Sequence, residues 1–314
     1  MFEPGSSAIM KVNIHADSWN RAIVSRNLGA MKTSSKIAAL LCASVLLFQA
    51  GCVGMARSWY LSSYDRDISS STRAIETARD NAHRAAAYAK RGSAYSEKAR
   101  YSRAFKLIPA DEYERLFGLA VKDHDQAIAL NPASAEAYYS RGQTYYDRAV
   151  LEVVVNGMLV GTVADQKAWF APAIADFRKA VDRDSRFYMA WDMLGLSHET
   201  IGELDQAISE YSQEMPLNPK LGRLRLADAY CLRAGSNQKE KGSEAAIADY
   251  EKSMDTGASA DGCSCDPYNP LIGLYAENRR YDQAWEVVHK AQRSRKWIAP
   301  ELLDKLKKDS GRNS

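Results

Sequence analysis

The sequence predicts an all-α fold built from repeated helical hairpins, and three observations support this prediction. Apolar residues recur at intervals of three and four along most of the chain, as on one face of an amphipathic helix. Small residues stand where two paired helices would cross closely. Similar segments also recur along the chain, which is typical of a fold whose units stack on their neighbours.

The clearest unit covers residues 188–221. Gly202 lies at the turn between its two expected helices. Pro219 follows the second helix, where a proline interrupts no helical hydrogen bond. The helical spacing is carried by Trp191, Leu194, Leu204, Ile208, Tyr211 and Met215.

Four other segments share this layout, two before this unit and two after it. The segment after Pro219 begins too close to that proline for a regular period, so its register is open by about two residues, with Ala227 as the expected small residue. A charged amphipathic helix over residues 299–308 is expected to close the stack, with Pro300 in its first turn. The landmarks of the four segments are Tyr88, Gly92, Ala120 and Ala127; Tyr138, Gly142, Ala173 and Phe177; Leu226, Ala227, Ala246 and Tyr250; and Leu271, Tyr275, Ala284 and Ala291.

These landmarks resemble the tetratricopeptide repeat, in which a tryptophan, a leucine and a glycine precede an alanine, an aromatic residue and a proline. The resemblance covers about residues 70–308. It implies a right-handed superhelical solenoid of about five helix–turn–helix repeats plus a capping helix. It also implies that the first helices of the hairpins line a groove that binds other proteins. The matching residues of the clearest unit are Trp191, Leu194, Gly195, Ala207, Tyr211 and Pro219.

By the same resemblance, certain positions on these first helices face the groove. Tyrosines beside acids and an amide suit an extended or helical peptide, because aromatic side chains give contact area at low entropic cost. The expected partner-binding residues are Glu136, Tyr139, Gln143, Tyr146, Asp192, Leu196 and Asp228.

The first two units are longer than the repeat requires, with inserts over residues 96–116 and 147–169. The simplest interpretation is that both helices of each hairpin run longer. The stretch 151–160 is apolar, β-branched and centred on Asn156-Gly157. Two interpretations of it stay open: a helix extension packed into the core, or an exposed β-hairpin.

An export signal is predicted ahead of the repeats. Lys32 and Lys36 precede an apolar run over residues 37–48, which is too short for a confident membrane span. Residues 31–52 form the predicted signal and residues 1–30 an upstream extension. Residues 53–69 are expected to be a polar tether, with the serines from position 69 capping the first helix, and residues 309–314 a frayed tail.

The small residues before Cys52 resemble a bacterial lipoprotein box, although Gln49 replaces its usual apolar residue. This resemblance implies a lipid on Cys52. Because Val53 rather than aspartate follows, it implies an outer-membrane lipoprotein that faces the periplasm, with other envelope proteins as partners. Two alternatives stay open: an uncleaved inner-membrane anchor, and cleavage after Ala56 with release into the periplasm.

The body of the protein is electrically neutral. The chain carries 42 basic and 39 acidic side chains, and the excess of +3 lies within residues 1–51. Nucleic-acid binding is therefore not expected, because it needs a basic surface. The sequence holds no phosphate-binding loop, nucleophile elbow or zinc-protease motif, so we predict no catalytic residue, cofactor or metal and no enzymatic activity. The alternative is an enzyme, or a regulatory subunit of one, with a site in the two inserts.

Five histidines and three body cysteines remain as reactive groups. His124 and His198 fall in aromatic packing positions of their repeats, so we expect them in the core. Structural zinc would require four ligands at wider spacing. In an oxidising compartment, we expect a disulfide from Cys231 to either Cys263 or Cys265.

Overall fold

The computed structural model describes residues 61–105, 107–155, 158–159, 161–257 and 265–312. The predicted signal, the upstream extension and Cys52 lie outside the described residues. Contacts divide the chain into two compact units. Unit 1 comprises residues 1–132 and 144–169, and unit 2 comprises residues 133–143 and 170–314.

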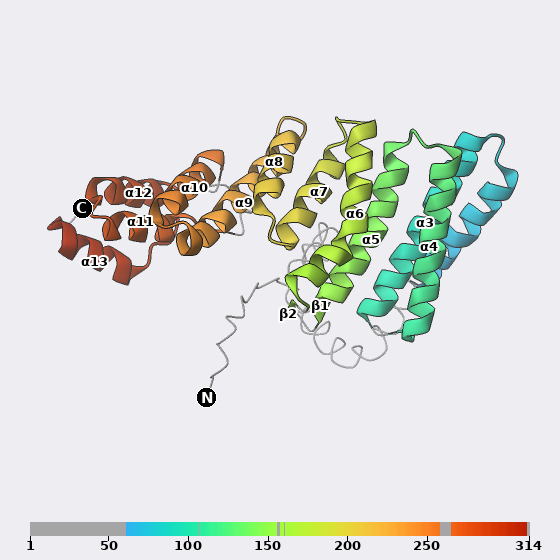
Figure 1. The fold of residues 1–314 in the computed structure, drawn as a ribbon, viewed down its shortest axis with the longest axis horizontal. Coiled ribbons are helices and arrows are strands. Elements are labelled where there is room, and N and C mark those ends of the chain that lie inside the picture. The colour runs from blue at the N-terminus through green and yellow to red at the C-terminus, as the bar shows by residue number, and fades with distance from the viewer. Residues whose placement is uncertain (1–60, 106, 156–157, 160, 258–264, 313–314) are drawn as a thin grey trace, which may run out of the picture. The chain divides into compact units, whose positions relative to one another are not determined.

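Both units are built from helices in antiparallel hairpins, as predicted (Figure 1). Residues 61–77 are helical and precede the first labelled helix. The next pair of hairpins is formed by α3 (Asn81–Ala104) with α4 (Ala110–Leu130), and by α5 (Ala135–Val153) with α6 (Val163–Arg183). Unit 2 continues with α7 (Tyr188–Thr200), α8 (Leu204–Glu214), α9 (Pro219–Glu240), α10 (Ser243–Thr256), α11 (Tyr268–Glu277), α12 (Tyr281–Arg293) and α13 (Pro300–Ser310).

Within a hairpin, a glycine of the first helix lies against a ring of the second. A Cβ atom on Gly142 would lie 2.9 Å from the Phe177 ring, and one on Gly195 would lie 2.5 Å from the Tyr211 ring. Real Cβ atoms do not approach other atoms so closely, so any larger residue would push the two helices apart. The predicted close crossing at these two glycines is therefore confirmed.

A buried ion pair joins the two helices in three of the hairpins. In each pair, Nε and Nη2 of an arginine donate to the two oxygens of one aspartate at 2.6–2.9 Å. The aspartate side chain is at most 7% exposed and has therefore lost most of its hydration. The two hydrogen bonds from the arginine compensate for that loss. The pairs are Arg91–Asp123, Arg141–Asp176 and Arg233–Asp249.

These ion pairs correct the predicted register of the α9–α10 hairpin. Arg141 stands directly before the small residue Gly142, and Arg233 stands directly before Ala234, which is fully buried. The small residue at the crossing is therefore Ala234, and the predicted Ala227 is wrong. The helical spacing did not reveal the error, because a shift of seven residues is about two helical turns and keeps the same face.

The ends of the chain differ from the prediction. Residues 61–77 are helical, so the predicted tether 53–69 is wrong from residue 61 onward, and the serines at 69–71 lie inside a helix. The cap of α3 is Asp80, whose side chain accepts the His83 backbone N–H at 2.8 Å. At the other end, α13 continues to Ser310, so the predicted tail begins later than residue 309.

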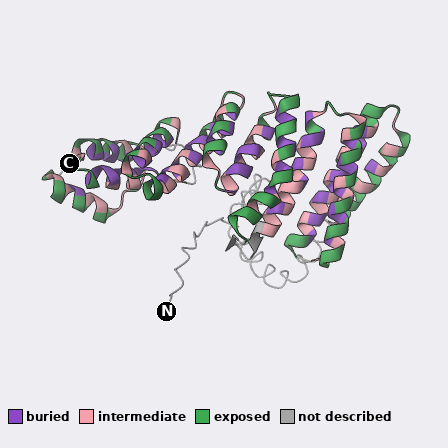
Figure 2. Ribbon diagram, in the orientation of Figure 1, coloured by how far each residue is buried: buried purple, intermediate pink, exposed green. Residues whose placement is uncertain are grey.

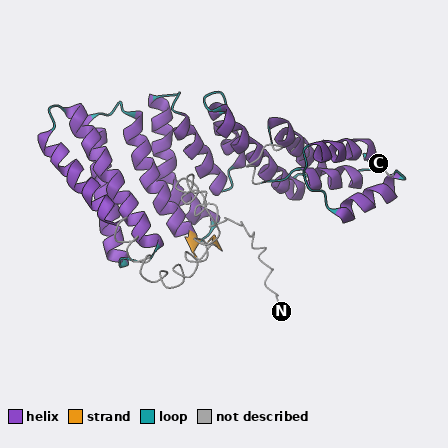
Figure 3. Cartoon of the chain, turned by 180° about the vertical axis from the view of Figure 1, so that it is seen from behind, coloured by secondary structure: helices purple, strands orange, loops and turns teal. Residues whose placement is uncertain are grey.

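The apolar insert contains both structures that the sequence left open. The helix α5 extends to Val153, and then β1 (Val154–Val155) pairs antiparallel with β2 (Met158–Leu159) (Figure 3). The intervening Asn-Gly pair lies outside the described residues. Thr162 and Asp165 then form a reciprocal cap on α6, because each side chain accepts the other's backbone N–H, at 2.9 and 3.2 Å.

Buried side chains lie on the helix faces that meet other helices, and exposed ones on the outer faces (Figure 2). In unit 2, one cluster spans α9 to α12, and α13 adds the fully buried Leu306 to it. The predicted closing helix is thus packed against this end of the core. Within the described part of the chain, no helix has both the length and the hydropathy needed to cross a membrane.

Candidate functional site

The first part of α5 and the whole of α7, both in unit 2, present the same three positions relative to their small residue: six before it, three before it and one after it. On α5 these positions hold Glu136, Tyr139 and Gln143, and on α7 they hold Met189, Asp192 and Leu196. A spacing of i, i+3 and i+7 places each triplet on one helical face. We call these six residues the binding face.

Tyr139 links the two triplets. Its ring centroid lies 5.8 Å from that of Phe177 and 5.0 Å from that of Phe187, the residue that precedes α7. The side chain is half-buried, so it contributes to packing between hairpins as well as to the face. By contrast, Glu136 is exposed at the beginning of α5, and Gln143 is half-buried.

Asp192 is already paired within the protein. Nε of Arg225, on α9, donates to its Oδ1 at 2.8 Å. Burial disfavours the charged guanidinium, but Asp192, Tyr211 and Glu199 together favour it, so the pKa of Arg225 is raised above its usual value. The charge of Asp192 is thus balanced within the protein.

Apolar contact area on α7 is more open than the sequence indicated. Met189 is 40% exposed and Leu196 is half-buried on the same face. Sequence reasoning missed Met189, although its distance from Gly195 equals that of Glu136 from Gly142. Comparing equivalent positions between the two helices was the signal that could have found it.

Two further predicted residues, Tyr146 and Asp228, lie outside these two triplets. Tyr146 is half-buried and lies in the part of α5 that belongs to unit 1. Asp228 accepts the backbone N–H of Cys265 at 3.1 Å and so holds the segment that leads into α11. In the corrected register Asp228 corresponds to Glu136, because both stand six residues before the small residue.

A disulfide joins Cys231 to Cys265, with the two Cα atoms 6.2 Å apart. Cys263 lies outside the described residues. The bond connects α9 to the beginning of the α11–α12 hairpin. Within the described residues, no group of three or more histidines, cysteines or acids is placed to hold a metal ion.

A buried carboxyl group lies behind the α7 face. The side chain of Glu214 is fully buried, and neither of its oxygens has a hydrogen-bond partner among the described residues. Burial raises the pKa of Glu214 to about 8, and the negative charge of Asp192 acts in the same direction. Burial also raises the pKa of Glu199, which accepts a hydrogen bond from the Tyr211 hydroxyl at 3.0 Å.

The two histidines in packing positions are in the core. His124 is fully buried, and its Nε2 lies 3.1 Å from the hydroxyl oxygen of Thr144. Nδ1 of His198 lies 2.8 Å from a carboxylate oxygen of Glu203, which fixes the imidazole ring. Both residues therefore have structural roles, as the sequence predicted.

Described residues of the two inserts line a small cavity in unit 1. They enclose a cavity of about 10 Å³ in unit 1, lined in part by Arg100, Tyr113 and Asp147. Such a volume holds about one water molecule. Burial raises the pKa of Asp147 to about 6, and its Oδ2 lies 3.4 Å from Nε of Arg100.

No protein-family model and no curated protein matches the chain. Among solved structures, the chain is similar to MamA, with 18% sequence identity, 62% of this chain and 89% of that chain covered, and a TM-score of 0.39. It is similar to TTC0263, a thermophilic TPR protein of Thermus thermophilus, with 19% identity, coverages of 64% and 87%, and a TM-score of 0.36. It is also similar to YrrB, a TPR protein with an unusual peptide-binding site, with 15% identity, coverages of 70% and 87%, and a TM-score of 0.35. The order of the helical hairpins and the close crossings at Gly142 and Gly195 agree with the helix–turn–helix repeat architecture that the sequence resemblance implies.

Proposed function

We propose that this protein is a protein-binding scaffold of the bacterial cell envelope, and that it holds a segment of a partner against the binding face. The observation that carries this proposal is the pair Met189 and Leu196, which offers apolar area on a face that recurs on α5. Solvated apolar side chains that line up on one helix are typical of a groove for a peptide or helix.

The spacing of this face defines its partner. Met189 and Leu196 are seven residues apart on a helix, which is about 10 Å. A partner helix matches that distance with apolar residues at i and i+7, and a peptide in the polyproline II conformation matches it with apolar residues at i and i+3, which share one side and are about 9 Å apart. Glu136 and Gln143 add an acceptor carboxylate and an amide at the other helix. No basic residue is required, since Arg225 already balances Asp192.

The location in the envelope is part of the same proposal. The signal-like segment and the small residues before Cys52 support a lipid anchor at that cysteine, and the outer membrane is the favoured site. The disulfide between Cys231 and Cys265 supports an oxidising compartment, where such bonds persist. Mass spectrometry of the mature N-terminus tests the anchor: a chain that begins at Arg57, or one that retains Met31, would contradict it.

Site-specific crosslinking tests the binding face. A photoreactive amino acid at position 189 should capture a partner in cells, whereas one at the exposed position of Trp297, on another part of unit 2, should not. The affinity of the purified full-length protein for the captured partner is then measured. We expect the Met189→Ser, Leu196→Ser variant to bind about tenfold or more weakly, because buried apolar anchors carry much of the binding energy.

Trp297→Ser is the matched control, since it also removes an exposed apolar side chain from unit 2. It should leave the affinity unchanged. Equal affinities of the double variant and the wild type, with both folded by circular dichroism, would move the binding site away from this face.

A further inference from the structure

The positions that form the binding face recur on a third helix of unit 2. On α9, in the corrected register, the residues six before, three before and one after the small residue are Asp228, Cys231 and Gly235. We call these three residues the third triplet. The ion pair between Arg225 and Asp192 joins α9 to α7, so the third triplet lies on the helix next to the binding face.

The third triplet is covered, whereas the first two are open. Cys231 is 2% exposed, but the equivalent residues Tyr139 on α5 and Asp192 on α7 are half-buried. The covering residue is Cys265, which forms the disulfide with Cys231. Its backbone N–H also donates to Oδ1 of Asp228 at 3.1 Å. A residue of the chain itself therefore contacts two of the three positions.

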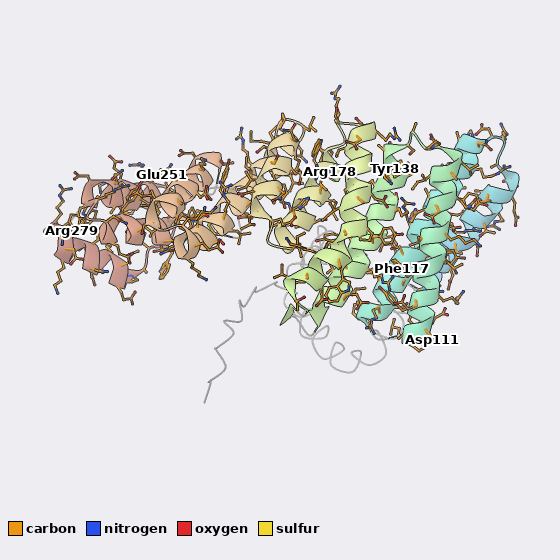
Figure 4. All side chains as sticks on the ribbon, viewed as in Figure 1. Asp111, Phe117, Tyr138, Arg178, Glu251 and Arg279 are labelled. Carbon is orange, nitrogen blue, oxygen red and sulfur yellow. A yellow bond between two sulfur atoms is a disulfide. The ribbon has the colours of Figure 1, made fainter. Side chains whose placement is uncertain are left out.

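The hairpin that follows is held by other contacts. The Tyr268 side chain, at the beginning of α11, is fully buried. The Tyr275 hydroxyl, also on α11, donates to a carboxylate oxygen of Glu251, which Figure 4 labels on α10. Three residues separate Cys265 from Tyr268, and an extended chain of that length spans about 10 Å. Cys265 can therefore leave α9 while α11 stays packed.

We propose that the binding face continues onto α9 and that Cys265 closes the third triplet, so that reduction of its disulfide lengthens the face by one hairpin; this proposal rests on the binding face of the proposed function. In the oxidised protein, Cys265 occupies the place on α9 that a partner occupies on α5 and α7. In the reduced protein, the partner replaces it.

The opened triplet suits a non-helical segment of the partner. Asp228 accepts a backbone N–H from Cys265, and such groups inside a helix are already bonded within that helix. Gly235 has no side chain, so the backbone of a partner can approach α9 closely. Glu136, the residue equivalent to Asp228 on α5, is exposed. The partner backbone therefore meets a carboxylate acceptor on both helices.

The reductant is a dithiol, and burial decides which sulfur it attacks. Its thiolate attacks Sγ of the partly exposed Cys265, because Cys231 is buried. Cys231 leaves as a thiolate and takes up a proton, and the second thiol of the reductant then displaces Cys265. The protein disulfide gains two electrons and two protons, while the dithiol is oxidised to a disulfide.

The test compares the oxidised full-length protein with the same protein reduced by dithiothreitol. A small diazirine compound labels accessible side chains on illumination, and mass spectrometry locates the labels. Labelling of residues 228–235 should rise several-fold on reduction, whereas labelling of residues 189–196 should not change. The Cys263→Ser, Cys265→Ser variant is the matched control, because Cys231 then has neither neighbour to pair with. Its labelling should equal that of the reduced wild type with or without dithiothreitol.

A photoreactive amino acid at position 235 tests whether the opened triplet binds the partner. In the double serine variant it should capture the same protein that position 189 captures. In the protein with the disulfide intact, the yield at position 235 should be several-fold lower, because Cys265 covers the neighbouring positions.

Continued protection of residues 228–235 after reduction would overturn the proposal. Loss of helix content on reduction, measured by circular dichroism, would also overturn it, because the disulfide would then hold the hairpin itself. Capture of a different protein, or of none, at position 235 of the variant while position 189 still captures one would overturn the continuation onto α9. Opening of residues 228–235 without capture at position 189 would instead contradict the proposed function and leave the opening in place.

Discussion

Replacing Glu214 with glutamine should make the protein more stable at neutral pH. The carboxyl group is fully buried, and its two oxygens lack hydrogen-bond partners among the described residues. Its pKa in the folded protein is about 8, against 4.5 for an ordinary glutamate. The folded state therefore keeps a proton that the unfolded state releases above pH 4.5, so the free energy of unfolding falls as the pH rises toward 8.

The size of the effect follows from the two pKa values. At pH 7 the unfolded carboxyl group is 2.5 pH units above its pKa of 4.5, while the folded one is still mostly protonated. Each pH unit corresponds to about 1.4 kcal/mol. The free energy of unfolding of the wild type is therefore about 3 kcal/mol lower at pH 7 than under acidic conditions. At pH 5 the loss is about 1 kcal/mol. Glutamine has the shape of the protonated acid and does not titrate.

The assay is urea denaturation followed by circular dichroism at pH 5, 6, 7 and 8. The stability of Glu214→Gln relative to the wild type should rise by about 2 kcal/mol between pH 5 and pH 7. Burial also raises the pKa of Asp147 and Glu199. The free energy of unfolding of the variant will therefore still depend on pH, and the quantity to compare is the difference between the two proteins at each pH. Glu277→Gln, at an exposed position, is the control. A difference that does not depend on pH would refute this account of Glu214.

Three further predictions concern packing, ion pairs and the disulfide. Gly195→Ala should lower the free energy of unfolding by about 1–3 kcal/mol in urea melts, because the added methyl group meets a tyrosine ring; unchanged stability would show that the helices do not cross there. Arg141→Ala should cost about 3–5 kcal/mol, since it leaves Asp176 buried without its partner, and a loss below 1 kcal/mol in thermal melts would contradict that burial. Cys231→Ser should lower the free energy of unfolding by about 3–4 kcal/mol, because it releases a loop of 34 residues. A reducing agent should destabilise the wild type but not this variant. Equal responses of the two proteins would argue against the pairing with Cys265.

Local regularities of the sequence determined the class of fold. The helical spacing of apolar residues, Gly142 and Gly195 at the crossings, and the turn at Gly202 predicted antiparallel helical hairpins, and the structure confirms them. Such features depend on residues close together in the chain or on a pattern that repeats. The core positions of His124 and His198 followed from the same repeat.

The sequence contained no comparable signal for contacts between residues that are far apart in the chain. Asp192 was predicted as a partner-binding residue, but its carboxylate pairs with Arg225, which stands 33 residues away in the chain. Spacing alone also misplaced the small residue of α9, because a shift of two turns preserves the face, and only the pair Arg233–Asp249 fixed the register.

Burial was the other property that only the tertiary structure decided. Met189 and Leu196 are both apolar residues at helical spacing, and nothing local tells an exposed methionine from a core one. Nothing in the sequence around Glu214 predicts that packing removes its carboxyl group from water. Solvent exposure depends on which helices cover a face, and that is set by neighbours brought together from elsewhere in the chain.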